Sequence, residues 1–240
     1  QRHSVEHYWD VVARLGIFPQ RPEDHIPTWH VGETERAAAH ATLTKLGVQW
    51  DRGSPLVLLH PGAHGFGGSK RWPVASFVEL AKRLLDQQVA QVVVLGGQED
   101  VEAAATIVAA TDGRALSLAG QTNLRESVAV IANAGVYIGC DSGLTQIAVA
   151  LGVPTVALFG VSNLAQFEPR TNWPERLRIL LPDPLPEPIG FFVGTESAFA
   201  RHDYAHDTRM ATIGVEKVYE ATLALCHCDA SAPISPPVAG

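Results

Sequence analysis

From residue 55 to residue 160 the chain alternates short apolar runs with longer segments of helical periodicity. The apolar runs predict strands over residues 56–61, 91–95, 115–119, 136–139 and 155–159. Most of them are nearly continuous in valine, leucine and isoleucine, as strands are when both of their faces are buried. The alternation therefore predicts an α/β fold with a Rossmann-like parallel sheet and helices on both of its faces.

The segments between these runs predict the helices. One of them, residues 76–88, carries its apolar side chains on a single stripe. The others are expected over residues 99–110, 124–134 and 143–151, with a closing helix over 215–225. Asn123 stands before one of these helices and Glu126 follows three residues later, which predicts a capping box.

The two ends of the chain do not follow this alternation. Residues 1–50 predict helices over 5–15 and 33–46, with several prolines between them. Residues 182–212 are proline-containing and predict a long irregular loop. Residues 227–240 are expected to form a disordered tail. We therefore expect the α/β domain to occupy residues 51–226.

The composition excludes several classes of protein. Of the 240 residues 46% are hydrophobic and 18% are charged, which is enough apolar side chain for a large core. The net charge of −7 argues against a general nucleic-acid binder. Three cysteines give no disulfide framework, and no apolar run reaches the length of a membrane span. These features indicate a cytoplasmic protein.

The loop after the first predicted strand is a candidate anion site. Gly62 and Ala63 lead into a glycine-rich stretch that ends at Ser69, Lys70 and Arg71. Glycine permits close backbone approach to a ligand, and the helix that follows adds its positive end to the charge of Lys70. The Walker A pattern would need glycine at 69 and serine or threonine at 71, so this is not that loop. A flexible surface loop with a solvated Lys–Arg pair is the alternative.

Asp141, Ser142 and Gly143 form a second junction of this kind, after the strand over 136–139. Asp or Ser here could simply cap the next helix. Together they offer a carboxylate for sugar hydroxyls and backbone N–H groups for phosphate, and Gln146 lies one turn further along the same face. Because both junctions lie at the carboxyl edge of one sheet, we expect the turns around Lys70 and Asp141 to face each other and hold a pyrophosphate.

Other residues are weaker candidates. Gly96 and Gly97 follow the second strand, and with the carboxylates beyond them they could receive a ribose. Those carboxylates, Glu99 and Asp100, would equally complement the dipole of the next helix. His202 and His206 are spaced i, i+4, but Asp203 stands where H-E-x-x-H needs glutamate, and we expect no metal site there.

In this order the motifs resemble glycosyltransferase family nine, the ADP-heptose:lipopolysaccharide heptosyltransferases and their relatives. The resemblance covers residues 55–165 and resumes over 213–225. The motifs that carry it are HPGA (60–63), KRWP (70–73), GG (96–97), LAGQTNL (118–124), DSGL (141–144) and AVALGVPTVALFG (148–160). It implies a GT-B architecture, in which this chain is the C-terminal half that binds the nucleotide sugar.

The resemblance also implies roles for individual residues. Lys70 would contact the diphosphate and Asp141 the heptose, which makes these two the expected catalytic residues. The expected donor-binding set is Gly62, Ala63, Ser69, Lys70, Gly97, Glu99, Thr122, Asp141, Ser142, Gly143 and Gln146. The reaction implied is inverting, metal-independent transfer of heptose or a related sugar from an ADP-activated donor, with no cofactor, to a hydroxyl of a glycan, lipid-linked or protein acceptor.

Three positions depart from the family. Gln146, Cys140 and Val161 stand where the family usually has histidine, asparagine and proline. Glutamine cannot carry charge, so a UDP- or GDP-sugar donor is one alternative and a non-catalytic sugar-nucleotide-binding module is another.

Residues 1–50 resemble only the end of the N-terminal acceptor domain and the linker, whereas the family keeps its catalytic base in that domain. We therefore expect the chain to bind the donor but to transfer sugar poorly. The family resemblance adds peripheral association with the inner membrane as an alternative to a purely cytoplasmic location.

Overall fold

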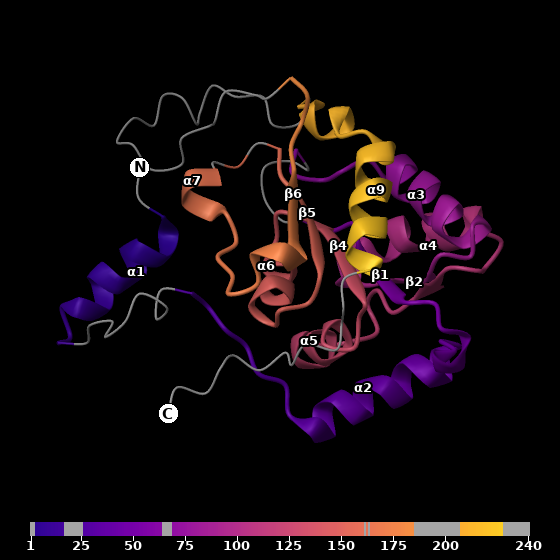
Figure 1. Cartoon of the computed structure of the whole chain (residues 1–240), viewed down its shortest axis with the longest axis horizontal. Coiled ribbons are helices and arrows are strands. Elements are labelled where there is room, and N and C mark those ends of the chain that lie inside the picture. The colour runs from indigo at the N-terminus through magenta and orange to yellow at the C-terminus, as the bar shows by residue number, and fades with distance from the viewer. Residues whose placement is uncertain are drawn as a thin grey trace.

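The computed structural model describes residues 3–16, 26–63, 69–160, 162, 164–184 and 207–227. Its centre is a six-stranded sheet in the order β3-β2-β1-β4-β5-β6 (Figure 1). The strands are β1 (Leu56–His60), β2 (Gln91–Val94), β3 (Leu116–Ser117), β4 (Val136–Cys140), β5 (Thr155–Leu158) and β6 (Leu177–Leu180). Every neighbouring pair is parallel, which confirms the predicted α/β fold.

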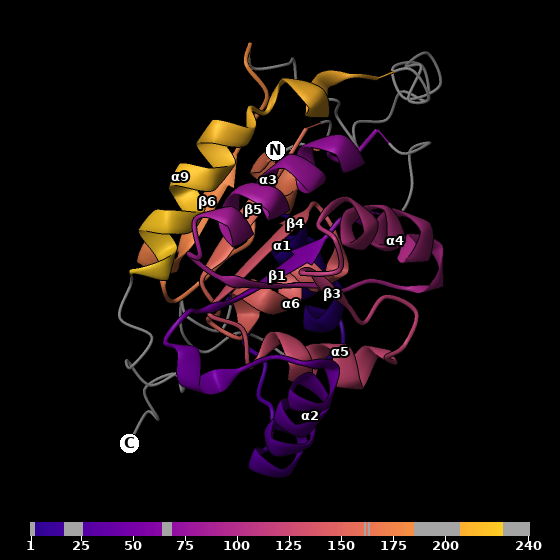
Figure 2. The same cartoon turned by 90° about the vertical axis from the view of Figure 1, so that its right-hand side faces the viewer.

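Helices cover both faces of the sheet. The helices are α1 (Ser4–Ala13), α2 (Glu33–Leu46), α3 (Val74–Asp86), α4 (Val101–Ala110), α5 (Leu124–Ile131), α6 (Gly143–Ala150), α7 (Leu164–Phe167) and α9 (Val215–Cys226). Short 3-10 turns are η2 (Trp50–Arg52), η4 (Gln98–Asp100), η5 (Pro174–Arg176) and η7 (Arg209–Thr212). One face of the sheet packs against α3, α4 and α9, and the other against α2, α5 and α6 (Figure 2).

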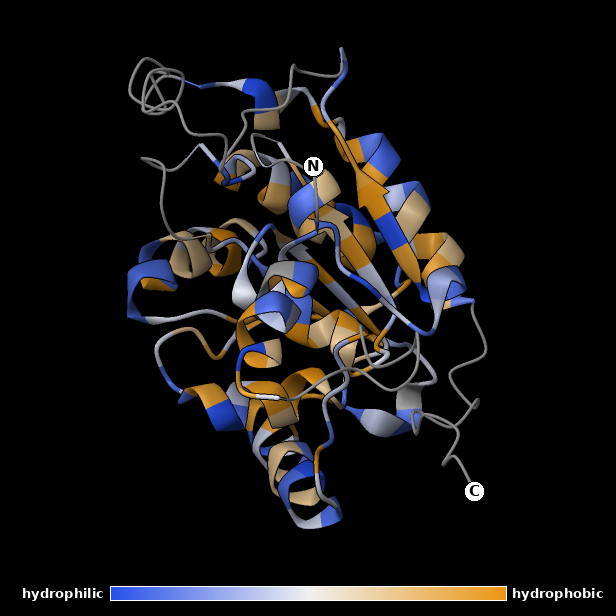
Figure 3. Cartoon of the chain, turned by 90° about the vertical axis from the view of Figure 1, so that its left-hand side faces the viewer, coloured by the Kyte–Doolittle hydropathy of each residue, from blue (hydrophilic) through white to orange (hydrophobic). Residues whose placement is uncertain are grey.

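The two faces have separate hydrophobic clusters, and strand β1 supplies both of them. Val57 and Leu59 belong to the cluster under α3, α4 and α9, whereas Leu56 and Leu58 belong to the cluster under α2 and α5. Successive side chains of a strand point to opposite faces of the sheet. All four are buried because helices cover both of those faces. This explains the continuous apolar runs in the sequence, and Figure 3 shows hydrophobic residues concentrated in the middle of the molecule.

Several predicted boundaries differ from those observed. Strand β6 and helix α7 were not predicted at all. The helix predicted to start at residue 76 starts at Val74, and the helix predicted over 99–110 divides into η4 and α4. The helices predicted over 124–134 and 143–151 end earlier, at Ile131 and Ala150.

The stretch 182–212 was predicted to be irregular throughout, and this is wrong at its end. Residues Arg209–Thr212 form η7, with Met210 buried in the core. Residues 185–206, with His202 and His206, and residues 228–240 lie outside the described part of the chain. In the described part, no helix combines the length and hydropathy that crossing a membrane requires.

Candidate functional site

The candidate site lies where β1, β2 and β4 end at the carboxyl edge of the sheet. The chain turns there at Gly62 after β1, at Gly97 after β2 and at Asp141 after β4. Strand β1 is the direct neighbour of both β2 and β4, so the three turns are adjacent in space. Ligands bind at this edge in open α/β sheets because the helices that follow present their N-terminal N–H groups there.

Lys70 and Asp141 meet at this edge. The Lys70 Nζ lies 2.6 Å from Asp141 Oδ2, and their side chains are 14% and 10% exposed. The hydroxyl of Ser162 donates to the same carboxylate oxygen. The ammonium of Lys70 also lies 6.0 Å from the centre of the Phe167 ring. The structure thus brings together the two turns that were predicted to face each other.

Ser142 begins helix α6 beside this pair. Its Oγ accepts the backbone N–H of Thr145 at 3.3 Å, as the first-turn cap of the helix. A side chain added to Gly143 would meet no atom within 4 Å, so the helix start faces open space. Gln146, one turn along, donates its amide to the carbonyl of Phe167 at 2.9 Å.

These residues line one cleft of about 500 Å³. The lining includes Lys70, Asp141, Ser142, Gly143 and Gln146 on one side and residues of α1 with Phe167 and Arg170 on the other. The contacts that hold α1 there include one between His3 Nε2 and the carbonyl oxygen of Glu168 at 2.8 Å, and an ion pair between Arg170 and Glu6 at 2.8 Å. The cleft therefore combines a cation, a carboxylate and a helix N-terminus.

The remaining predicted residues do not line this cleft. Gly62 and Gly97 pack around the carboxylate of Asp100, and the carbonyl of Ala63 accepts the Nε–H of Arg71 at 3.1 Å. Ser69 is buried. Glu99 is exposed and its carboxylate lies close to Gly97.

Thr122 lies in a different place. Its hydroxyl is 2.8 Å from that of Ser127, and it lines a second cleft of about 460 Å³ between α2 and α5. The predicted donor-binding set thus divides among the Lys70 cleft, the surroundings of Asp100 and this second cleft.

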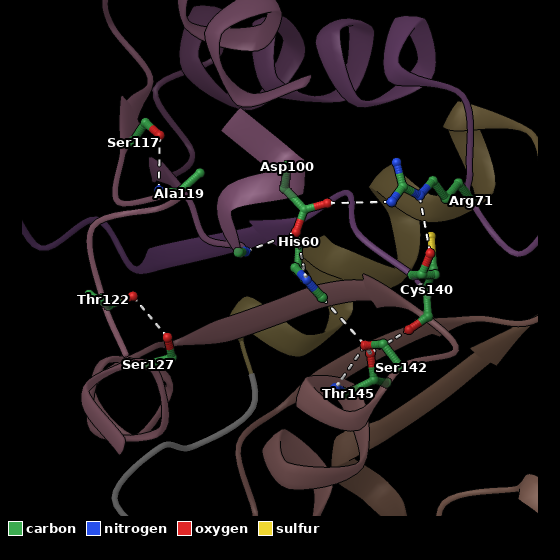
Figure 4. Close-up of polar contacts among 12 residues, drawn as sticks. His60, Arg71, Asp100, Ser117, Ala119, Thr122, Ser127, Cys140, Ser142 and Thr145 are labelled. Carbon is green, nitrogen blue, oxygen red and sulfur yellow. Dashed lines mark hydrogen bonds and ion pairs between the residues drawn. The ribbon is translucent and has the colours of Figure 1, made fainter. Parts of the chain in front are cut away.

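Sequence reasoning missed a buried polar chain that runs beneath the turns (Figure 4). His60, at the end of β1, lies 3.7 Å from Asp100 through Nε2 and 2.9 Å from the hydroxyl of Tyr137 through Nδ1. The sequence offered Asp100 as a carboxylate beside a ribose or as a partner for the helix dipole, yet it is 1% exposed. A histidine that ends an otherwise apolar strand was the available signal for this chain of contacts.

The environment shifts the pKa of several groups near the site. Burial would raise the pKa of Asp100, but the His60 ring beside it, the hydrogen bond from Gly97 and the charge of Arg71 outweigh that effect, so the pKa is lowered. Burial raises the pKa of Tyr137, and it raises that of Cys140 to about 12. Asp100 is therefore ionised at neutral pH, whereas the buried phenol and thiol are neutral.

No metal site is evident in the described ranges, where no three His, Cys, Asp or Glu side chains form a group that could hold an ion. The sulfur of buried Cys140 accepts a hydrogen bond from the backbone N–H of Trp72 at 3.2 Å, which is a structural role.

Known proteins resemble this chain in sequence and in fold. Lipopolysaccharide heptosyltransferase 2 of Escherichia coli (strain K12) is 43% identical over 113 residues, which is 45% of this chain and 32% of that protein. Lipooligosaccharide heptosyltransferase 2 of Haemophilus influenzae is 34% identical over 130 residues, 52% of this chain and 37% of that protein. The chain thus spans about a third of the length of these curated relatives.

Solved glycosyltransferase structures superpose on this chain. The E. coli ADP-heptose lps heptosyltransferase II superposes with a TM-score of 0.64 at 28% identity, covering 89% of this chain and 60% of that one. The family 9 glycosyl transferase of Veillonella parvula has a TM-score of 0.73 at 22% identity over 94% of this chain and 60% of its own, a likeness of fold. Residues 1–181 match Glycosyltransferase family 9 (heptosyltransferase), and the chain belongs to that family.

Proposed function

We propose that this chain is the nucleotide-sugar-binding half of a glycosyltransferase that transfers heptose, or a related sugar, from an ADP-activated donor to an acceptor hydroxyl. The observation that carries the proposal is the cleft in which Lys70 and Asp141 meet beside the start of α6. The names of its relatives, an ADP-heptose heptosyltransferase at 28% identity among them, support this donor and a lipopolysaccharide acceptor.

The proposed reaction inverts the sugar carbon. The acceptor oxygen forms a bond to that carbon while the bond to the diphosphate breaks, and the leaving diphosphate takes the electron pair. Lys70 and the N–H groups at the start of α6 would stabilise this developing negative charge without a metal. Asp141 would accept hydrogen bonds from the sugar hydroxyls.

The acceptor must also lose its proton to a general base. We assign no residue of this chain to that role, so we expect donor binding with little transfer by the chain alone. In the proposed organisation residues 1–50 are the end of an acceptor domain with its linker and residues 51–226 form the donor domain. The enzyme would work in the cytoplasm or at the inner face of the membrane where its acceptor lies.

Isothermal titration of the chain with ADP, UDP and GDP tests the proposal. We expect ADP to bind most tightly, and EDTA to leave its affinity unchanged. Tighter binding of UDP or GDP would favour the other donors that Gln146 leaves open. Failure of all three nucleotides to bind at millimolar concentration would contradict the proposal.

A transfer assay separates the enzyme from a non-catalytic sugar-nucleotide-binding module. The assay would supply ADP-heptose and a heptose-deficient lipopolysaccharide to a full-length protein that includes this chain. We expect sugar transfer that is lost when Lys70 or Asp141 is replaced. Nucleotide binding without transfer would favour the binding module.

A further inference from the structure

We propose that Asp100 and His60 are positioning residues, a buried carboxylate–imidazole pair that joins the turn after β2 to the start of α6 and orients the hydroxyl of Ser142. The inference rests on the proposed function in so far as Ser142 belongs to a donor site. The pair does not line the cleft that contains Lys70 and Asp141.

The first step of the argument is how closely the backbone encloses Asp100. The N–H of Gly97 donates to Asp100 Oδ2 at 2.9 Å. A Cβ added to Gly62 would lie 2.6 Å from Oδ1, and one added to Gly96 would lie 2.7 Å from Oδ2. Real side chains do not tolerate such distances. Both positions must therefore be glycine for the turns after β1 and β2 to pack this closely around the carboxylate.

The second step concerns the charge of Asp100. Burying a carboxylate costs on the order of several kcal/mol, unless cations and hydrogen-bond donors compensate for the hydration that it loses. The compensating groups here are the His60 ring at 3.7 Å and the Arg71 Nη2 at 3.9 Å. Neither distance is a short hydrogen bond, and Asp100 Oδ1 has no hydrogen-bond partner among the described residues. A buried carboxylate with partners at these distances is weak evidence for net stabilisation, so we infer a role in specifying geometry.

The third step connects this pair to the candidate site. His60 Nδ1 lies 2.9 Å from the hydroxyl of Tyr137 and 3.4 Å from that of Ser142. With its proton on Nε2, facing Asp100, the ring offers the single lone pair of Nδ1 mainly to the nearer hydroxyl of Tyr137. The hydroxyl of Ser142 lies against the same nitrogen at 3.4 Å and 3.1 Å from Thr145 Oγ1. Ser142 in turn caps α6 through the N–H of Thr145. A continuous series of contacts therefore leads from Asp100 to the cleft, as Figure 4 shows.

The test replaces Asp100 by Asn, which keeps the shape and removes the charge. Glu102→Gln is the matched control, because Glu102 is an exposed acid two residues away on α4. We expect Asp100→Asn to weaken ADP binding in a titration by about tenfold, comparable with the loss of a group that orients a direct ligand in a metal site. We expect the control to bind ADP as the unchanged chain does.

Two readouts separate positioning from a general loss of stability. If Asp100 acts through Ser142, the two changes should not be additive. The double variant Asp100→Asn, Ser142→Ala should then bind ADP as tightly as whichever single variant binds it more weakly. Hydrogen exchange without ligand should also rise in the peptide that covers Ser142–Thr145 and stay unchanged in α9. Should Asp100→Asn fail to fold, His60→Gln breaks the same link and leaves the carboxylate with Gly97.

The outcomes are distinct. Additive losses of ADP affinity, or unchanged exchange at Ser142–Thr145 in a folded variant, would overturn the positioning role. If exchange rises there but the unchanged chain binds no nucleotide, the proposed function fails while the link between the two turns stands.

Discussion

Lys70 is oriented by a carboxylate that also neutralises much of its charge. Its ammonium lies 2.6 Å from Asp141, so a bound diphosphate would compete with that carboxylate for the same cation. Replacing Lys70 by Ala should still weaken ADP binding by about 1.5–3 kcal/mol, because a hydrogen bond to a charged group is lost. Titration calorimetry measures this, with Lys82→Ala on the exposed face of α3 as the control. A change of less than about twofold in the dissociation constant would remove Lys70 from the proposed site.

A second prediction at this scale concerns Cys140. Burial raises the pKa of its thiol to about 12, and its sulfur accepts the N–H of Trp72. The thiolate is the reactive form, so Cys140 should resist N-ethylmaleimide at pH 8 in the native protein and react once urea unfolds it. Peptide mass spectrometry gives the result. Rapid labelling of Cys140 in the native protein would show that this part of the site opens to solvent.

The sequence led to some site residues and not to others for a physical reason. Lys70 and Asp141 each follow a buried strand, and parallel strands bring their carboxyl ends to one edge, so their meeting followed from local patterns. The burial of Asp100 depends on Gly62, which is 38 positions away along the chain, and no local pattern reports that contact. An acid in the first turn of a helix has an ordinary explanation, which concealed its position in the interior.

Among the elements, α5 depends on a pair of reciprocal hydrogen bonds at its start. Asn123 Oδ1 accepts the N–H of Glu126 at 3.0 Å, and Glu126 Oε2 accepts the N–H of Asn123 at 2.8 Å. Asn123→Ala should lower the free energy of unfolding by about 1 kcal/mol, whereas Asn123→Asp keeps the acceptor and should change it little. Urea denaturation measures both. Equal stability of the two variants would mean that the cap does not stabilise α5.

The elements that the sequence predicted are those with strong local signals. The capping box at Asn123 is confirmed, and the central strands coincide with apolar runs. Strand β6 (Leu177–Leu180) includes Arg178, and all four of its residues are only partly buried. It lies at the edge of the sheet, and its pairing with β5 rather than its own composition makes it a strand. Helix α7 has four residues, too few for a helical period to be visible.

At the scale of the whole molecule, Asp100 links acidity to folding. Its pKa is lowered in the folded protein, since the His60 ring, the hydrogen bond from Gly97 and the charge of Arg71 together outweigh its burial. Its ionisation therefore stabilises the fold above the unfolded pKa of about 3.9, and this contribution is lost as the pH falls through the lower folded pKa. Below about pH 4, the free energy of unfolding of Asp100→Asn should therefore fall less steeply with acidification than that of the unchanged chain.

Urea unfolding at several pH values between about 5 and 2.5 measures this difference for the chain and for Asp100→Asn. All other acidic groups are the same in both proteins, so the difference between their slopes isolates Asp100. Parallel slopes would mean that Asp100 titrates alike in the folded and unfolded states.

The pairing of Lys70 with Asp141 also bears on how a nucleotide would arrive. The chain carries a formal net charge of −7, and the lysine that would receive the phosphates is already balanced by a carboxylate. Little positive potential then extends into solution to draw an anion in from a distance. Encounter should therefore proceed at an ordinary diffusive rate that added salt does not slow, and selectivity would arise in how slowly the right nucleotide leaves.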